Sequence, residues 1–313
     1  MERHRLEKLT HYCRPVQKDL KAILKNELLR DRGKERVLNR NGFLYSPGSH
    51  PVLLVAHLDT VHQKAPTLFY IDKTQSPDGD LWCEEGIGGD DRCGVFIITE
   101  LIKKLDCHVL FTEDEEAGGW GAKDFCESGI KPDVQFIVEF DRQGNNDAVF
   151  YACDNPEFTS FVENYGFRKS EGTFSDISFI APALGIGAVN LSSGYYHAHS
   201  RQEIIRVADV DSIIERASRL LSNVGTRYGY IAKKYSEWDW EPEIRFGDWR
   251  YGGKNGDAQC PYCDAVIGGA TFLDYCPYCH EELSAQCEDC QHVVSLFECV
   301  VIRDYIYCTS CME

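Results

Sequence analysis

Short continuous apolar runs alternate with longer amphipathic stretches through residues 1–232. The run 52–56 has no polar position, which is typical of a strand that is covered on both faces. Between such runs, apolar residues recur every three or four positions, as Leu20, Leu24 and Leu28 do, and this spacing places them on one face of a helix. Strands that alternate with helices predict an α/β fold with a mostly parallel, twisted sheet flanked by helices. The pattern predicts strands at 52–56, 109–112, 136–140 and 188–191, and helices at 19–29, 95–105 and 209–224.

The pattern changes after residue 235. Residues 236–258 are polar, aromatic and glycine-rich, and we interpret them as a linker packed against the surface. Residues 259–313 form an approximate duplication, 259–283 and 286–313, that contains four Cys-x-x-Cys pairs. We therefore predict a large domain over 1–235, a linker and a small C-terminal module.

The four cysteine pairs have the spacing of zinc ribbons. Two such pairs can supply four thiolates to one tetrahedral zinc ion and leave no open coordination position. A unit of about 30 residues cannot build an adequate core, so the metal replaces one. Acidic residues outnumber basic ones in this module, which favours a protein partner over nucleic acid. We predict two structural zinc ions, one bound by Cys260, Cys263, Cys276 and Cys279 and the other by Cys287, Cys290, Cys308 and Cys311.

Composition narrows the classes of function. The chain has 15 cysteines, and the seven outside the pairs are scattered singly, which is typical of reduced, mostly buried thiols. A formal net charge of −17 disfavours attraction to nucleic acid or anionic membranes. No apolar run reaches about 18 residues, and the charged start of the chain lacks the apolar core of an export signal. We expect a cytoplasmic protein that binds neither membrane nor nucleic acid.

Five short segments gather acidic and histidine residues just after an apolar run or in a glycine-rich turn. They are 56–60, 88–94, 112–119, 139–141 and 196–203. Groups at the carboxyl ends of strands in an open α/β sheet converge on one crevice. Two histidines and several carboxylates there suit a pair of divalent ions such as zinc, and cations would offset the repulsion among the carboxylates. The joint occurrence of the segments predicts a metal centre.

In this order, the five segments resemble the metal-binding motifs of the co-catalytic dinuclear zinc exopeptidases. That superfamily contains peptidase T, the glutamyl aminopeptidase-like enzymes and the bacterial leucyl aminopeptidases. The resemblance spans residues 57–203 and their surroundings and excludes the tail. The stretches between the motifs are too short for a further domain of about 100 residues, so the chain resembles members of the superfamily without a lid domain.

The resemblance implies a role for each matching residue. Asp90 would bridge two zinc ions, with His57 and Asp141 completing the first site and Glu116 and His199 the second. The peptide bond that follows Asp90 would be cis, as in relatives.

Two further carboxylates would act without binding metal in this interpretation. Asp59 would orient His57, and Glu115 would be the general base. A water held between the zinc ions would become hydroxide near neutral pH and attack the substrate carbonyl. Glu115 would take its proton and pass it to the leaving nitrogen.

Several assignments leave alternatives open. Residues 113–116 are four consecutive acids, so the register of base and ligand depends on the Ala-Gly-Gly-Trp-Gly-Ala stretch that follows. Glu139 lies on the same strand face as Asp141 and could replace it as a ligand. His197 competes with His199, but only His199 has a glutamate four residues later.

Substrate contacts are the least defined part of the prediction. Asp176 belongs to a Ser-Asp turn that matches a turn in relatives and could face substrate, and Tyr195 or Tyr196 could donate to the oxyanion. The remaining candidates for metal binding, which we interpret as surface or packing residues, are His50, His62 and His108.

Three functions follow from these residues. The first is an aminopeptidase or dipeptidase, and the second is a zinc amidohydrolase that deacylates small N-acyl amino acids with the same metal chemistry. The third is a non-catalytic adaptor that binds a partner through its ribbons. Retention of both candidate histidines, the metal-site carboxylates and the base favours an enzyme, with a peptide or small amide as substrate.

Overall fold

The computed structural model describes residues 1–62, 64–74 and 78–233, together with the backbone of six short strands after residue 257. It divides into two compact units, Met1–Lys233 and Lys234–Glu313. Among the helices that the structure describes, none has the length and apolar character needed to cross a bilayer.

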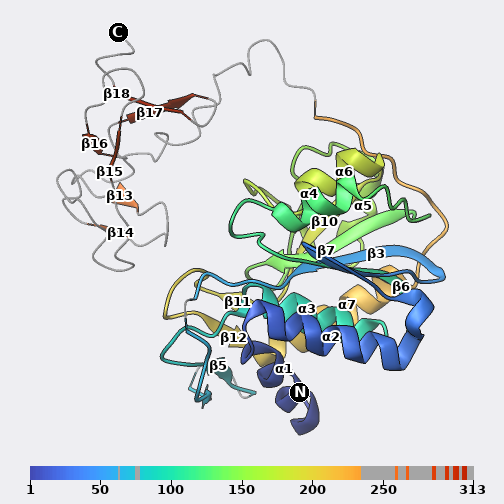
Figure 1. Cartoon of the computed structure of the whole chain (residues 1–313), viewed down its shortest axis with the longest axis horizontal. Coiled ribbons are helices and arrows are strands. Elements are labelled where there is room, and N and C mark those ends of the chain that lie inside the picture. The colour runs from blue at the N-terminus through green and yellow to red at the C-terminus, as the bar shows by residue number, and fades with distance from the viewer. Residues whose placement is uncertain are drawn as a thin grey trace. The chain divides into compact units, whose positions relative to one another are not determined.

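A mixed eight-stranded sheet forms the centre of the first unit (Figure 1). Its strands are β1 (Leu38–Arg40), β2 (Phe43–Ser46), β3 (His50–His57), β6 (Cys107–Thr112), β7 (Phe136–Arg142), β8 (Asp147–Val149), β9 (Arg168–Ser170) and β10 (Ala188–Ser192). The order is β1-β2-β6-β3-β7-β10-β8-β9, and the middle strands β6, β3, β7 and β10 run parallel. Antiparallel pairings of β2 with β6 and of β8 with β10 make the sheet mixed. The predicted α/β architecture is confirmed.

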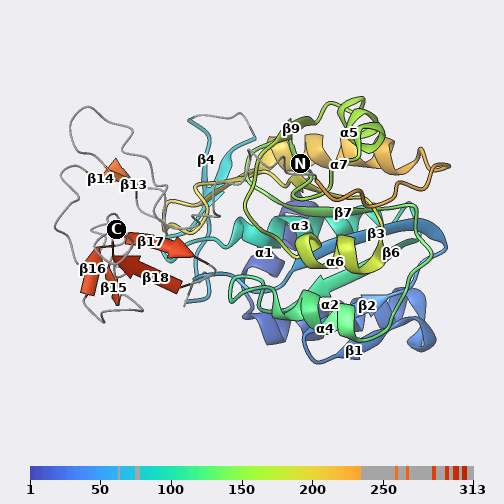
Figure 2. The same ribbon diagram turned by 90° about the horizontal axis from the view of Figure 1, so that it is seen from above.

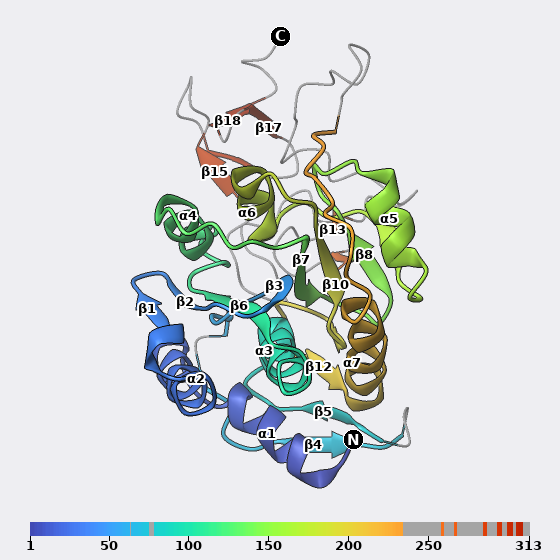
Figure 3. The same cartoon turned by 90° about the vertical axis from the view of Figure 1, so that its right-hand side faces the viewer.

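Helices cover both faces of this sheet (Figures 1 and 3). One face carries α2 (Gln17–Arg32), α3 (Gly89–Leu101) and α7 (Val207–Leu221), with α1 (Arg3–Cys13) packed against α3. The other face carries α4 (Trp120–Glu127) and α6 (Ile177–Leu184). Figure 2 shows α5 (Pro156–Glu163) beside β9 at one edge of the sheet and β1 at the opposite edge.

Alternate side chains of β3 enter two separate cores. Val52 and Leu54 belong to the cluster on the α3 face, and Leu53 and Val55 to the cluster on the α4 face. All four side chains are fully buried. Because successive side chains of a strand point to opposite faces, a strand buried on both faces needs an unbroken apolar run.

A second, antiparallel sheet was not predicted. It consists of β4 (Tyr70–Asp72), β5 (Asp80–Trp82), β11 (Tyr195–Tyr196) and β12 (Ile204–Arg206), in the order β11-β12-β5-β4. Its strands have two or three residues each, too few for a hydrophobic period to show. The turn between β11 and β12 carries His199, so this small sheet positions one of the predicted metal ligands.

The predicted elements differ from the observed ones mainly at their ends. In α3, predicted over 95–105, the observed element covers Gly89–Leu101, but its backbone is kinked and non-helical at Asp90 and Asp91. Asp90 and Asp91 are both buried, and because their backbone departs from helical geometry, helical periodicity does not extend to them.

In the second unit, the described strands pair as three antiparallel two-stranded ribbons. β13 (Ala258–Gln259) pairs with β14 (Val266–Ile267), β15 (Ser284–Gln286) with β16 (Val293–Ser295), and β17 (Cys299–Ile302) with β18 (Tyr305–Cys308). The predicted linker, 236–258, lies outside the described residues except for Ala258. The side chains of the eight paired cysteines, over 259–283 and 286–313, are also outside them, so the two zinc ribbons stay a prediction.

Candidate metal centre

The predicted metal-binding side chains meet at the carboxyl edge of the large sheet. His57 is the last residue of β3, and Asp141 lies near the end of the parallel neighbour β7. Glu116 follows β6, and Asp90 lies in the kinked, non-helical segment at the start of α3. His199 comes from the turn between β11 and β12. Parallel strands thus bring residues that are far apart in the sequence to one crevice.

One half of the centre is buried. The Nε2 atom of His57 lies 3.1 Å from Oδ1 of Asp90 and 3.3 Å from Oδ1 of Asp141. His57 is fully buried. Asp91, which was not predicted as a ligand, forms a compact group with His57 and Asp141 whose ligand atoms lie within 4.8 Å of one another.

The other half is partly open. The Nε2 atom of His199 lies 3.2 Å from Oδ2 of Asp90 and 3.1 Å from Oε1 of Glu116. The His199 side chain is 39% exposed, so solvent or substrate can approach from this side. Asp90 therefore directs one carboxylate oxygen toward each histidine, which is the arrangement expected of a ligand that bridges two ions.

The donor set fits divalent metal. It combines two imidazoles with several carboxylates, a nitrogen and oxygen set that suits zinc. Among the described residues, one buried carboxylate oxygen of Asp91 and one of Glu139 have no hydrogen-bond partner. Leaving such atoms unpaired is costly, and a cation in the crevice would remove that cost.

The pKa values of the crevice carboxyls support the same conclusion. Burial, with help from nearby carboxylates, raises the pKa of Glu115 to about 10. Burial and the charge of Asp90 raise the pKa of Asp141 to about 7. The protein alone therefore stabilises these carboxylates poorly in their charged form, and a dipositive ion beside them would lower both pKa values.

Asp59 connects the first histidine to the acidic segment. Its Oδ1 lies 3.2 Å from Nδ1 of His57, as expected of a carboxylate that orients this ring. The same oxygen accepts the backbone N–H of Glu115 at 3.1 Å, and Oδ2 accepts that of Glu116 at 3.0 Å. The second function, fixing the backbone of the acidic segment, was not predicted.

The four consecutive acids divide into two pairs. The Nε2 group of Gln17 donates to Oδ1 of Asp114 at 2.9 Å, and the Asp114 N–H donates to Oε1 of Gln17 at 3.0 Å. Glu113 forms an ion pair with Lys21. Two acids are thereby held by α2, which leaves Glu115 and Glu116 on the side of the crevice.

The loop before α3 is held by Glu203, whose contribution was not predicted. Its fully buried carboxylate accepts the N–H of Gly88 at 2.8 Å and that of Asp90 at 2.9 Å. It also lies 2.8 Å from Nε2 of His62. The peptide bond between Asp90 and Asp91 is cis, as the resemblance implied. The sequence pointed to Glu203 only as the neighbour that distinguished His199.

The structure distinguishes the alternatives that the sequence left open. Asp141, rather than Glu139, faces His57; Glu139 is fully buried and accepts a hydrogen bond from the Ser175 hydroxyl. His199, rather than His197, contacts the carboxylates of the centre.

The other three histidines have structural partners. His62 pairs with Glu203, His108 with the Tyr45 hydroxyl at 2.8 Å, and His50 with the Leu221 carbonyl at 2.8 Å. These contacts agree with packing roles.

The predicted substrate residues are already engaged within the protein. Asp176 is fully buried and accepts a hydrogen bond from the Thr112 hydroxyl. The Tyr195 hydroxyl donates to the backbone carbonyl of Asp141 at 3.3 Å, whereas that of Tyr196 donates to Asp209 at 2.5 Å. Tyr196 is thus not brought to the metal ligands, and substrate roles for all three residues stay predictions.

Comparison with protein-family models and with curated proteins gives no match. Several solved structures, however, share the fold. Aminopeptidase PepT from Bacillus cereus is 14% identical with a TM-score of 0.56, over 69% of this chain and 97% of that chain. A tripeptidase from Staphylococcus aureus is 13% identical with a TM-score of 0.56, over 69% and 96%. An aminopeptidase from Desulfurococcus kamchatkensis is 14% identical with a TM-score of 0.50, over 71% and 95%. The likeness shows that this chain has the fold of these peptidases.

Proposed function

We propose that the first unit is a metal-dependent peptidase that removes the N-terminal residue of a peptide or splits a dipeptide. The observation that carries the proposal is the position of Asp90 between two histidines, with one oxygen toward each. The shared fold with two aminopeptidases and a tripeptidase supports it. We infer zinc as the metal from the mixture of imidazole and carboxylate donors.

The chain offers ligands for two ions. His57, Asp90 and Asp141 would hold one ion, and Asp90, Glu116 and His199 the other. When bound, the ions lower the pKa of a water molecule and polarise the substrate carbonyl. Asp59 keeps the His57 ring in the orientation in which Nε2 faces the centre.

Glu115 is suited to be the general base. It is 8% exposed, and its carboxylate makes no hydrogen bond or ion pair within the described part of the chain, so an oxygen is free to accept a proton. The hydrogen bond from its N–H to Asp59 fixes its position relative to His57. A base that takes the proton from water can return it to the leaving nitrogen.

The activity can be tested on the purified, zinc-loaded chain with three substrate sets: aminoacyl-anilides, dipeptides and N-acetyl amino acids. We expect hydrolysis of substrates with a free α-amino group. Turnover of the N-acetyl compounds alone would show that the protein is a deacylase and not a peptidase. Turnover of none of the three, with the crevice metals bound, would contradict both enzymatic functions and favour a non-catalytic adaptor.

The C-terminal unit would bind two structural zinc ions through its four cysteine pairs and dock a protein partner. We also propose a cytoplasmic location. The six described cysteines outside the pairs support it, since all are unpaired thiols and five are buried. They are Cys13, Cys83, Cys93, Cys107, Cys126 and Cys153.

A further inference from the structure

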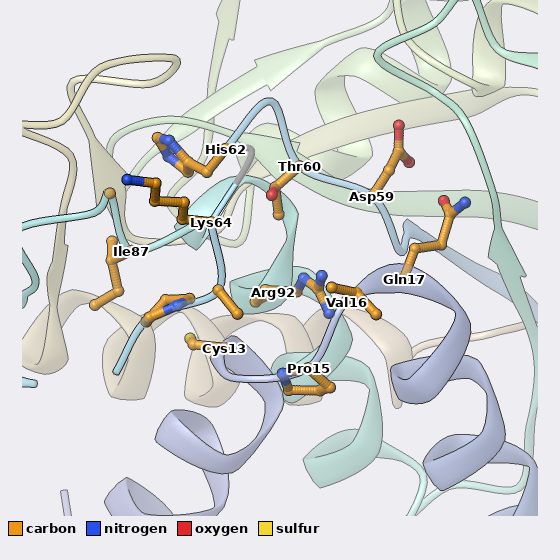
Figure 4. A pocket seen from close by; sticks show the side chains of 14 residues that line it. Cys13, Pro15, Val16, Gln17, Asp59, Thr60, His62, Lys64, Ile87 and Arg92 are labelled. Atoms are coloured by element: carbon orange, nitrogen blue, oxygen red, sulfur yellow. The ribbon is translucent and has the colours of Figure 1, made fainter. Parts of the chain in front are cut away.

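A small cavity lies beside the candidate metal centre, on the side of the N-terminal helices (Figure 4). Its volume is about 180 Å³. Its walls come from the turn between α1 and α2, the loop after β3 and the loop before α3. Asp59 belongs to one wall, so the cavity adjoins the residue that orients His57.

Arg92 supplies a buried positive charge to this cavity. Its side chain lies in the middle of the view in Figure 4 and is 3% exposed. The only hydrogen bond of its guanidinium within the described residues runs from Nη1 to the Tyr12 carbonyl at 3.3 Å. The Nε atom has no partner, and no described carboxylate forms an ion pair with this arginine. The carboxylates of Asp59 and Asp91 attract this guanidinium through space, but neither forms an ion pair with it. A buried guanidinium without an ion-pair partner is costly.

The other charges around the cavity leave it positive. Lys64 lines it, is exposed and makes no hydrogen bond or ion pair with another described residue. The Asp59 carboxylate is already used by His57 and two backbone N–H groups. His62 is paired with Glu203.

We infer that this cavity binds a carboxylate, which pairs with the Arg92 guanidinium and the Lys64 ammonium. A planar carboxylate matches the paired donors of a guanidinium. Pro15, Val16 and Ile87 give the cavity an apolar wall, which suits a short hydrocarbon stem better than the fully polar surface of a phosphate. The carboxylate could belong to an acidic substrate or to a free small acid.

Fluorine NMR can test the site directly, with trifluoroacetate as the probe and the full-length chain as the protein. We expect the probe resonance to broaden on addition of protein and to recover when excess acetate is added. Lys64→Gln should weaken binding roughly three- to tenfold, since it removes one charge-assisted hydrogen bond. Lys131→Gln is the matched control, because Lys131 is exposed, has no described partner and lies outside the cavity lining.

Two results would overturn the inference. One is the absence of broadening with the unaltered chain. The other is binding that Lys64→Gln leaves unchanged, because the anion would then occupy the metal centre or another basic surface. Lys64 is exposed, so its substitution should leave folding intact.

Hydrolysis kinetics can identify the source of the carboxylate, and this experiment rests on the proposed function. The unaltered chain would prefer glutamyl-anilide over glutaminyl-anilide if the cavity binds the side-chain carboxylate of the substrate. Loss of that preference in Lys64→Gln would confirm this source. Equal turnover of the two anilides, with probe binding intact, would assign it to a free acid. Failure of hydrolysis with probe binding intact would contradict the proposed peptidase while leaving the carboxylate site standing.

Discussion

The carboxylate of Asp59 links three parts of the candidate centre at the scale of single atoms. One oxygen contacts the far nitrogen of the His57 ring, and both oxygens accept backbone N–H groups of the acidic segment. The ring that would bind one ion and the segment that carries Glu115 and Glu116 therefore share one anchor. This arrangement couples metal affinity to the position of the base.

Replacement of Asp59 by asparagine tests that coupling. The amide can accept through one oxygen only and must place an NH₂ group toward one of the three donors. We expect the affinity for the crevice zinc to fall about 10–100-fold, measured as the free zinc concentration that gives half-maximal hydrolysis. Asp72→Asn, in an exposed strand of the small sheet, is the control. An unchanged zinc requirement in Asp59→Asn would show that Asp59 does not support the site.

Glu115 and Glu116 should respond differently to the same chemical change. Glu115→Gln keeps the volume of the side chain but cannot accept the proton, so the rate should fall about 10²–10⁴-fold while crevice zinc is retained. Glu116→Gln weakens a ligand that lies 3.1 Å from His199, so zinc content and activity should fall together.

If Glu115→Gln lost zinc and Glu116→Gln lost only activity, Glu115 would be the metal ligand and Glu116 the general base. If neither substitution changed turnover, the assignment of the acidic segment would be wrong. Metal analysis and steady-state kinetics on the same preparations separate these outcomes.

The residues of the centre differ in how far the sequence could predict them. His57, Asp90, Asp141 and His199 were predictable because each lies at the end of a recognisable apolar run or in a motif. Gln17 was not, because its partner Asp114 is 97 positions away and Gln17 itself belongs to no motif. The absence of a carboxylate partner for Arg92 is likewise a fact of three-dimensional packing.

At the scale of elements, α3 must pack very closely against β7. A Cβ atom on Gly94 would lie 2.0 Å from the backbone carbonyl oxygen of Phe140 and 2.4 Å from the Asp91 carboxylate. Both contacts are far inside van der Waals distance. Glycine at this position lets the helix that carries Asp90 approach the strand that carries Asp141.

Gly94→Ala should therefore destabilise the protein. In an isolated helix this change would stabilise by about 1 kcal/mol, but here we expect a loss of about 1–3 kcal/mol in the free energy of unfolding, from overpacking. Gly229→Ala is the matched control, since a Cβ atom there meets nothing within 4 Å. Urea denaturation measures both, and a Gly94→Ala protein as stable as the Gly229→Ala control would contradict the close packing.

The parallel centre of the sheet was predictable from the sequence, whereas its edges and the small sheet were not. Strands such as β3 are buried on both faces, so their apolar runs are unbroken and reach several residues. The strand β11 has two residues and pairs with β12 through contacts that no local period reveals. Since β11 and β12 flank His199, the unpredicted sheet bears directly on the open half of the centre.

At the scale of the whole molecule, the first unit holds its own C-terminal segment. The Lys233 N–H donates to the Ala152 carbonyl at 2.8 Å, and Ala232 forms a β-bridge with Cys153. These contacts attach the last residues of the unit to the region that follows β8. A chain that ends at Lys233 therefore keeps them, along with every predicted ligand of the crevice and the base Glu115.

We expect a chain truncated after Lys233 to bind two zinc ions and the full-length chain to bind four, as counted by metal analysis. The difference would be the two ions assigned to the cysteine pairs of the second unit.

Cys260→Ser in the full-length chain should reduce the count toward three and leave hydrolysis intact, because it disrupts one ribbon and no crevice ligand. The truncated chain should also hydrolyse aminoacyl-anilides. A truncated chain that is folded and holds two ions but has no activity would show that the second unit takes part in catalysis or substrate capture. The contrary result is a full-length chain that holds only two ions, both lost on replacement of the paired cysteines. That result would show that the crevice binds no metal and would contradict the proposed hydrolysis.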